Sequence, residues 1–132
     1  MQKIKPLHLL RFGLGIDMLL HGLVRIPNLD AFIAHSMGGF KTSFLPPIMV
    51  TYFLYVLPFI EAVIGILILV GGKATRLGFI AGGFLMAILL FGTASHQAWD
   101  VASQQVIYLV AFAVALMFYD NGQTNVSIPA QL

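Results

Sequence analysis

The sequence contains no cysteine and carries very little charge. None of its 132 residues is Cys, so thiolate nucleophiles, disulfide exchange, iron–sulfur ligation by Cys and Cys-based zinc sites are excluded for this chain. Asp, Glu, Lys and Arg together make up only 9% of the residues, and the basic ones are scattered, which argues against a nucleic-acid-binding surface. Any redox chemistry must therefore use a bound cofactor or a partner.

What the chain has in abundance is apolar side chains. Hydrophobic residues make up 59% of the sequence, more than a water-soluble domain of this length would carry. Four apolar stretches are each long enough for one transmembrane helix, namely residues 7–26, 49–71, 77–97 and 101–119. The predicted fold class is therefore all-α: one integral-membrane four-helix bundle over residues 1–132, with a long outer loop between the first two helices.

The basic residues predict how this bundle is oriented. Those that flank the stretches gather before the first one and between the second and third: Lys3, Lys5, Lys73 and Arg76. The other connections offer only Lys41. Since cytoplasmic segments carry an excess of Lys and Arg, we expect both termini in the cytoplasm. The long loop, residues 27–48, then lies outside, with residues 30–37 as a short interfacial helix, and the polar tail after Asp120 is expected to be loosely ordered.

Ionisable residues occur inside the first apolar stretch. Asp17, His21 and Arg25 follow one another at i,i+4 spacing, and Arg11 lies on the same half of the predicted helix. Each such group costs roughly 3 kcal/mol or more at mid-depth in a bilayer, so each needs a partner or a function. We expect one polar stripe in which Arg25 holds Asp17 and His21 in place.

Polar residues of the other three stretches are predicted to meet this stripe. Glu61 falls near the middle of the second stretch, and a rise of about 1.5 Å per residue places the others in the outer half of the bundle. The sequence thus predicts an outward-facing pocket, with these ligand or proton-path candidates: Asp17, His21, Arg25, Tyr55, Glu61, His96, Gln104 and Tyr108. Within it His21, His96 and Tyr55 would donate hydrogen bonds, whereas Asp17 and Glu61 would pass protons.

The same residues also have structural interpretations, which the sequence leaves open. The ionisable residues of the first stretch could neutralise one another, and Glu61 could be a protonated acid bonded to a backbone carbonyl. His96 lies near the membrane interface, where tyrosines are common anchors as well. Residues that permit close helix contact or free a backbone carbonyl are predicted to be structural: Gly22, Pro58, Gly65, Gly78 and Gly82. Arg11 is predicted to be structural as well.

A set of these residues resembles the DoxX family of small four-helix bacterial membrane proteins. The set comprises Arg11, Gly13, Gly15, His21-Gly22, Arg25, Pro27, Pro58, Glu61, Gly65, Gly71-Gly72, Arg76 and Gly78, and it covers about residues 10–97. Family members more often have Lys at the position of Arg25, which keeps the charge but changes its hydrogen-bonding geometry. The resemblance implies a protein of a bacterial inner (plasma) membrane that is associated with redox metabolism. Some relatives look like subunits of a thiosulfate:quinone oxidoreductase, and others are linked to membrane complexes that detoxify radicals.

Two functions remain open at this point. The first is a membrane subunit that binds a quinone-like molecule in the pocket and acts with an oxidoreductase partner. The alternative is a non-catalytic scaffold or assembly subunit whose polar stripe faces a partner helix, since the chain has no chemistry that is complete by itself. A membrane-protein partner or a homo-oligomer is expected in addition to the lipid bilayer. A bis-histidine haem between His21 and His96 is less favoured, and no metal site is predicted.

Overall fold

The computed structural model describes residues 3–124 and is helical over almost all of that range. Four long helices carry the chain back and forth: α1 (Pro6–Arg25), α3 (Pro47–Val70), α4 (Lys73–Ser95) and α5 (Trp99–Thr124). All four are long and apolar enough to cross a membrane. The predicted all-α class is confirmed, and the four apolar helices of the described chain are consistent with a multi-pass membrane protein.

The helices differ from the predicted stretches mainly at their ends. Helix α4 begins at Lys73 rather than at residue 77, and α5 continues through Asn121 and Gly122 to Thr124. Polar residues at these ends interrupt the apolar sequence pattern, but the helical backbone hydrogen bonds continue through them. The first residues of the tail that was expected to be loosely ordered are therefore helical. Residues 125–132, the rest of that tail, lie outside the described residues.

The connection between the first two spans is not an open loop. It consists of a 3₁₀ turn η1 (Ile26–Asn28), helix α2 (Leu29–Gly39) and a second 3₁₀ turn η2 (Phe40–Thr42). The short helix predicted at residues 30–37 is thus present, inside a longer helical segment. Pro27 in η1 lacks an N–H group and cannot continue the hydrogen bonding of α1, which turns the chain into α2. Helix α2 then packs against α3.

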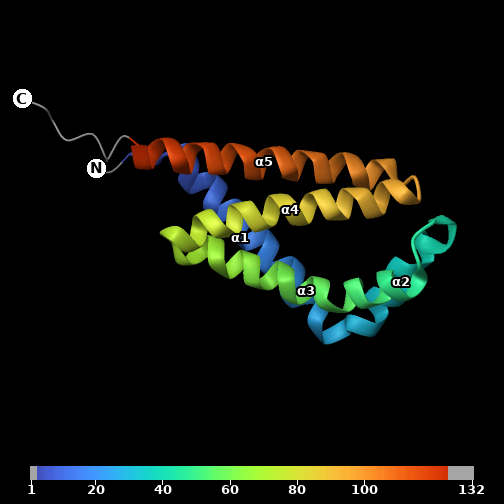
Figure 1. The fold of residues 1–132 in the computed structure, drawn as a ribbon. Helices are drawn as coiled ribbons and strands as arrows, with labels where there is room; N and C mark the ends of the chain where they lie inside the picture. Colours follow the sequence, from blue (N-terminus) through green and yellow to red (C-terminus); the bar gives the residue numbers. More distant parts are fainter. Residues whose placement is uncertain (1–2, 125–132) are drawn as a thin grey trace, which may run out of the picture.

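The bundle has two distinct ends. At the α2 end, α1 and α4 finish and α3 and α5 begin. At the hairpin end, Gly71 and Gly72 join α3 to α4 with φ of 102° and 61°, values that favour glycine. Both described termini lie at the hairpin end (Figure 1).

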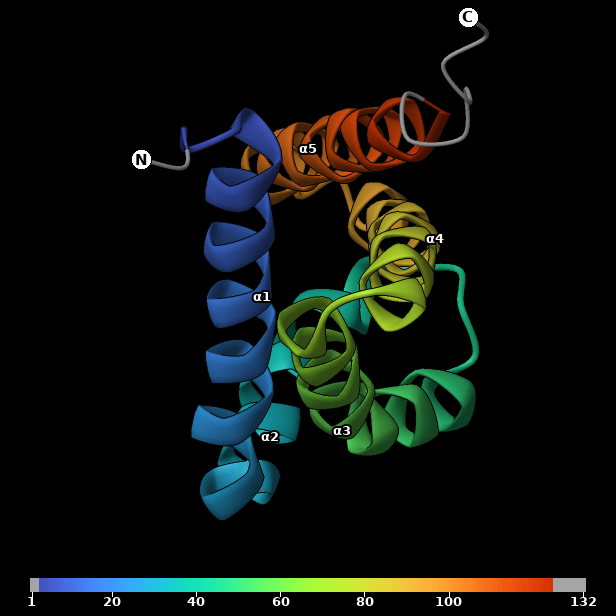
Figure 2. The ribbon, with the colours of Figure 1, turned by 90° about the vertical axis from the view of Figure 1, so that its left-hand side faces the viewer.

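The four spans form an incomplete ring. Helix α1 packs on α3, α3 on α4, and α4 on α5, whereas α1 and α5 touch far less. In the view from the hairpin end, α1 lies inclined to α4 and α5 (Figure 2). The interior is therefore bounded by two well-packed helix pairs, α1–α3 and α4–α5.

Glycine permits the closest of these contacts. A Cβ on Gly22 would overlap the carbonyl oxygen of Pro58 on α3, and one on Gly65 would overlap the backbone of Leu19 on α1. Gly78 and Gly82 face two different helices: Gly78 packs on Ile68 of α3, whereas Gly82 receives the ring of Phe112 of α5. Each of these glycines marks a place where two helices approach closely.

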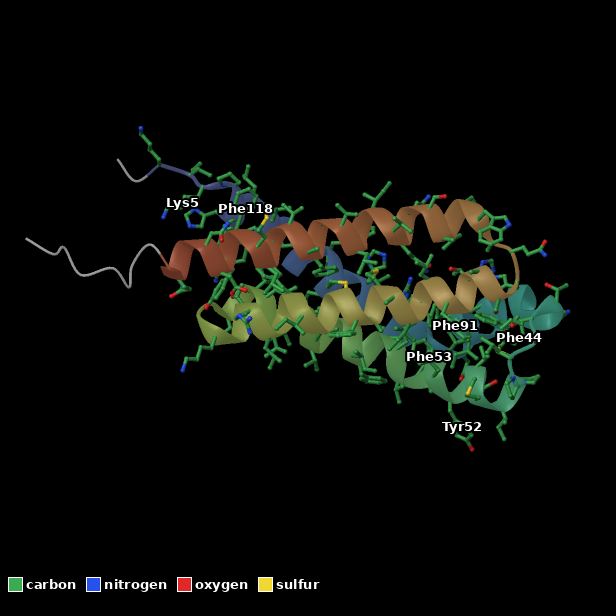
Figure 3. All side chains as sticks on the ribbon, turned by 45° about the horizontal axis from the view of Figure 1, so that its top comes forward. Lys5, Phe44, Tyr52, Phe53, Phe91 and Phe118 are labelled. Carbon is green, nitrogen blue, oxygen red and sulfur yellow. The ribbon has the colours of Figure 1, made fainter. Side chains whose placement is uncertain are left out.

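The outer surface of the bundle is apolar. Large hydrophobic side chains are exposed on every span, among them Phe12, Leu20, Tyr52, Phe59, Val63, Phe84, Ile107 and Met117. Figure 3 shows Tyr52 extending away from the ribbon. Contiguous apolar surface of this extent is unusual for a soluble protein and suits contact with lipid tails.

Candidate functional site

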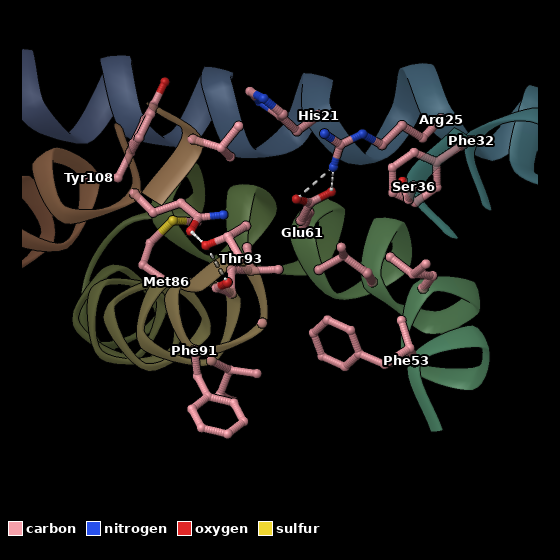
Figure 4. A pocket seen from close by; sticks show the side chains of 18 of the residues that line it. His21, Arg25, Phe32, Ser36, Phe53, Glu61, Met86, Phe91, Thr93 and Tyr108 are labelled. Atoms are coloured by element: carbon pink, nitrogen blue, oxygen red, sulfur yellow. Dashed lines mark hydrogen bonds and ion pairs between the residues drawn. The ribbon is translucent and has the colours of Figure 1, made fainter. Parts of the chain in front are cut away.

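A cavity of about 520 Å³ lies towards the α2 end of the bundle, and all four spans and α2 line it. Figure 4 shows it from close by. Small-molecule sites usually have volumes of roughly 300–1,000 Å³, so this cavity has the size of a ligand site. The predicted site residues that line it are Asp17, His21, Arg25, Glu61, Gln104 and Tyr108.

An ion pair between Arg25 and Glu61 joins α1 to α3 at this cavity. Nη1 of Arg25 donates to both carboxylate oxygens of Glu61, at 2.9 and 2.7 Å. Glu61 is only 3% exposed, and the Arg25 guanidinium also lies 4.6 Å from the ring centre of Phe32 on α2. The sequence had suggested that Arg25 holds Asp17 and His21 in place. Instead, Arg25 pairs with a buried carboxylate on another helix. The close approach at Gly22 brings the two helices near enough for this pair.

A second polar group centres on Asp17. His21 Nδ1 lies 2.9 Å from the backbone carbonyl oxygen of Asp17 and 3.3 Å from its carboxylate, one turn away on the same helix. The hydroxyl of Tyr108 donates to the other carboxylate oxygen at 3.2 Å. This bond links α5 to α1 at a place where those helices otherwise touch little. The Asp17–His21 pair is thus tied into the bundle through Tyr108.

A third polar contact links α4 to α5. The Thr93 hydroxyl donates to the side-chain oxygen of Gln105 at 2.6 Å, and both residues line the cavity. Gln105 was not among the predicted site residues. The sequence could have indicated Gln105, since it lies three residues before Tyr108 and Gln104 lies four before it, and both spacings place an amide on the same helix face as Tyr108. The cavity is wide enough to include both.

Two predicted site residues, Tyr55 and His96, do not line the cavity. Helix α3 turns Leu54 and Leu57 towards the cavity, which directs the Tyr55 hydroxyl towards Asp30 on α2, at 3.5 Å. The ring of His96 packs on Phe40 with centroids 4.5 Å apart, and its Nδ1 lies 3.1 Å from the carbonyl oxygen of Gly92.

The geometry considered for a bis-histidine haem is consequently not formed in the described chain. His21 lines the cavity, whereas His96 is held at the end of α4 outside it. The sequence placed the two histidines at similar depth, but depth alone does not fix the direction in which a side chain leaves its helix.

Arg11 has a structural position at the hairpin end. Its Nε donates to the carbonyl oxygen of Ile68 at 3.0 Å and its Nη2 to that of Leu69 at 2.6 Å. The hydroxyl of Thr75 donates to the Ile68 oxygen as well, at 2.8 Å. The last carbonyls of a helix have no partner within the helix, so Arg11 and Thr75 satisfy the end of α3.

The cavity offers hydrogen-bond donors, carboxylates and apolar surface. Within residues 3–124, no three His, Asp or Glu side chains are arranged to hold a metal ion. No protein-family model, curated protein or solved structure matches the chain.

Proposed function

We propose that this protein binds a quinone-like small molecule in the cavity and acts with an oxidoreductase partner. One observation carries the proposal: Asp17, Arg25, Glu61 and Tyr108, from three different helices, reach one side of a cavity whose other sides are mainly apolar. A quinone is a flat apolar ring with carbonyl oxygens that accept hydrogen bonds. Apolar walls with a few convergent polar groups are the usual design of a site for such a molecule.

The polar groups divide into donors and proton carriers. Both bonds from Arg25 to Glu61 use Nη1, so within the described chain the remaining guanidinium donors are left for a carbonyl oxygen of the ligand. Tyr108 supplies a hydroxyl next to Asp17. Reduction of a quinone takes up protons as well as electrons. In this proposal Glu61 and Asp17 deliver the protons and the partner oxidoreductase supplies the electrons.

Quinone binding to the purified protein tests this proposal. We expect Arg25→Gln to weaken the binding of a benzoquinone by about 10-fold or more, because a hydrogen bond from a charged group contributes about 1.5–3 kcal/mol. Arg76→Gln is the matched control, since Arg76 pairs with Asp120 on the surface outside the cavity. Helical content and monodispersity show whether each variant folds.

A coupled assay tests the proton role separately. Glu61→Gln should lower the turnover of the partner-coupled reaction while the quinone still binds. Protein that contains no extractable quinone, binds none that is added, and is indifferent to Glu61→Gln would refute the proposed function.

We further propose membership of the DoxX family and a location in the plasma membrane of a bacterium, with both termini in the cytoplasm. The support is the set of residues that resembles the family and the bias of Lys and Arg towards the hairpin end, where Lys73 and Arg76 begin α4.

A scaffold or assembly subunit is the second candidate function, and one observation favours it. The side chains of Asp17 and His21 are 31% and 43% exposed, and both also line a groove on the outer face of α1. Polar groups at mid-span avoid lipid, so a partner helix or a second copy could cover them. Pull-down from native membranes would recover that partner, whereas a lone monodisperse species would count against the scaffold.

A further inference from the structure

Helices α3 and α4 contact each other closely at one end only. Near the hairpin end, a Cβ on Gly78 would lie 2.6 Å from the Ile68 side chain and 3.3 Å from the carbonyl oxygen of Ile64. Towards the α2 end the two helices diverge (Figure 1). The cavity occupies the space between them, because residues from the first half of α3 and the last part of α4 line it.

The cavity reaches the lipid-facing surface between these two helices. Met49, Ile88 and Phe91 line it, yet they are 51%, 53% and 59% exposed. Side chains that lined only an enclosed cavity would be buried. We call this opening the α3–α4 slot, defined by Met49, Phe53, Ile88 and Phe91.

The slot and the polar groups lie on opposite sides of the cavity. In Figure 4 the Arg25–Glu61 pair lies next to α1, whereas Phe53 and Phe91 lie on the side away from α1. The slot residues are all apolar. The rings of Phe91 and Phe44 also pack edge to face, with centroids 6.1 Å apart.

From this separation we propose that the α3–α4 slot holds the hydrocarbon tail of a ligand whose polar head lies at the Arg25–Glu61 pair. This inference rests on the proposed function and names the ligand class: an amphiphile with a long isoprenoid or alkyl chain. A cavity of about 520 Å³ has room for a ring with a short chain, whereas a longer isoprenoid chain must extend out of it. Through the slot the chain remains in the bilayer while the head enters.

The energetics of the tail favour this route over one past α1. Lipid chains are about as apolar as Leu or Phe, so a tail moves from lipid into the slot with little change in free energy. A tail leaving past α1 would lie against the partly exposed Asp17 and His21, whose polar atoms a hydrocarbon chain cannot hydrogen-bond. The slot therefore tolerates a tail and contributes little affinity of its own.

Two probes with the same head test the proposal: a dimethoxy-methyl-benzoquinone without a tail, and the same ring with a decyl chain. Binding is measured in phosphatidylcholine vesicles, and each dissociation constant is given as the quinone concentration in the membrane. The wild-type protein should bind both probes with similar dissociation constants. Phe91→Trp, which narrows the slot, should weaken the decyl probe by about 10-fold or more and leave the tail-less probe unchanged.

Phe84→Trp is the matched control, because Phe84 is exposed on the same helix but does not line the cavity. If Phe91→Trp does not fold, Ile88→Trp serves the same purpose. Equal loss of both probes in the slot variant, or no loss of either, would overturn the slot. If neither probe binds the wild-type protein, the proposed function fails as well, so the two failures are distinguishable.

Photolabelling gives an independent readout. A diazirine at the end of the decyl chain should label the slot residues, and excess unlabelled decyl quinone should remove the label. The vesicle lipid is itself a competitor in large excess. If the slot is labelled in its presence and only unlabelled decyl quinone prevents the labelling, an ordinary phospholipid chain is excluded as the occupant. Labelling of α1 between Gly13 and Val24 would contradict the proposal.

Discussion

Among single residues, Gly22 and Gly13 have opposite surroundings on the same helix. A Cβ on Gly22 would overlap the Pro58 carbonyl oxygen and lie 2.6 Å from the backbone nitrogen of Ala62, whereas nothing lies within 4 Å of one on Gly13. We expect Gly22→Ala to destabilise the fold by about 1–3 kcal/mol, because α1 must move away from α3. Denaturant titration in detergent measures this loss.

Gly13→Ala is the control, and it should be neutral or slightly stabilising, since Ala favours a helix by about 0.5–1 kcal/mol over Gly. Equal effects of the two substitutions would show that α1 does not pack on α3 through Gly22.

The ionisable residues show what could be foreseen at the residue scale. That Arg11, Arg25 and Glu61 need partners follows from the cost of charge inside a membrane. The partner that each one takes does not follow. Arg25 and Glu61 lie on different helices, and the relative rotation of these helices depends on contacts between residues that are distant in the sequence. The i,i+4 pattern was right for Asp17 and His21, which interact within one helix, and wrong for Arg25.

Among the secondary-structure elements, the end of α3 depends on a side chain from α1. Arg11→Leu removes two donors from the Ile68 and Leu69 carbonyls. Bonds from a charged donor contribute about 1.5–3 kcal/mol each, so residues near Gly71 and Gly72 should exchange their amide hydrogens faster in the variant. Hydrogen exchange followed by mass spectrometry measures this locally.

Arg11→Lys should have an intermediate effect, because an ammonium group cannot reproduce the planar fork of the guanidinium. Arg76→Gln removes an exposed pair at the same end and should change exchange little. Unchanged exchange in Arg11→Leu would contradict the assigned role.

The elements themselves were largely predictable, since four long apolar runs permit little else. The connection after α1 was less so. Its mixed polarity gave a short helix at residues 30–37, but nothing in the pattern required the 3₁₀ turns on either side. Tyr55 and His96 were misplaced for a related reason: their depth follows from residue number, whereas their direction follows from how each helix is rotated against its neighbours.

On the scale of the whole molecule, the proposed orientation can be tested because the chain has no cysteine. Lys41 lies at the α2 end and Lys73 at the hairpin end, and both are exposed. In intact cells a membrane-impermeant maleimide should label Lys41→Cys and should reach Lys73→Cys only after the cells are opened. The reverse pattern would mean that the bundle is inserted with its termini outside.

The narrow attachment of α4 to α3 has a mechanical consequence. The α4–α5 pair approaches α3 closely near Gly78. At its other end it contacts the segment that joins α1 to α3, through Ser95–Ser43 and His96–Phe40, and nearer its middle Tyr108 bonds to Asp17 of α1. If this pair tilts about its close contact with α3, the largest displacement occurs at the other end, towards which the cavity lies. A ligand that widens the α3–α4 slot would therefore change the angle between the α1–α3 pair and the α4–α5 pair.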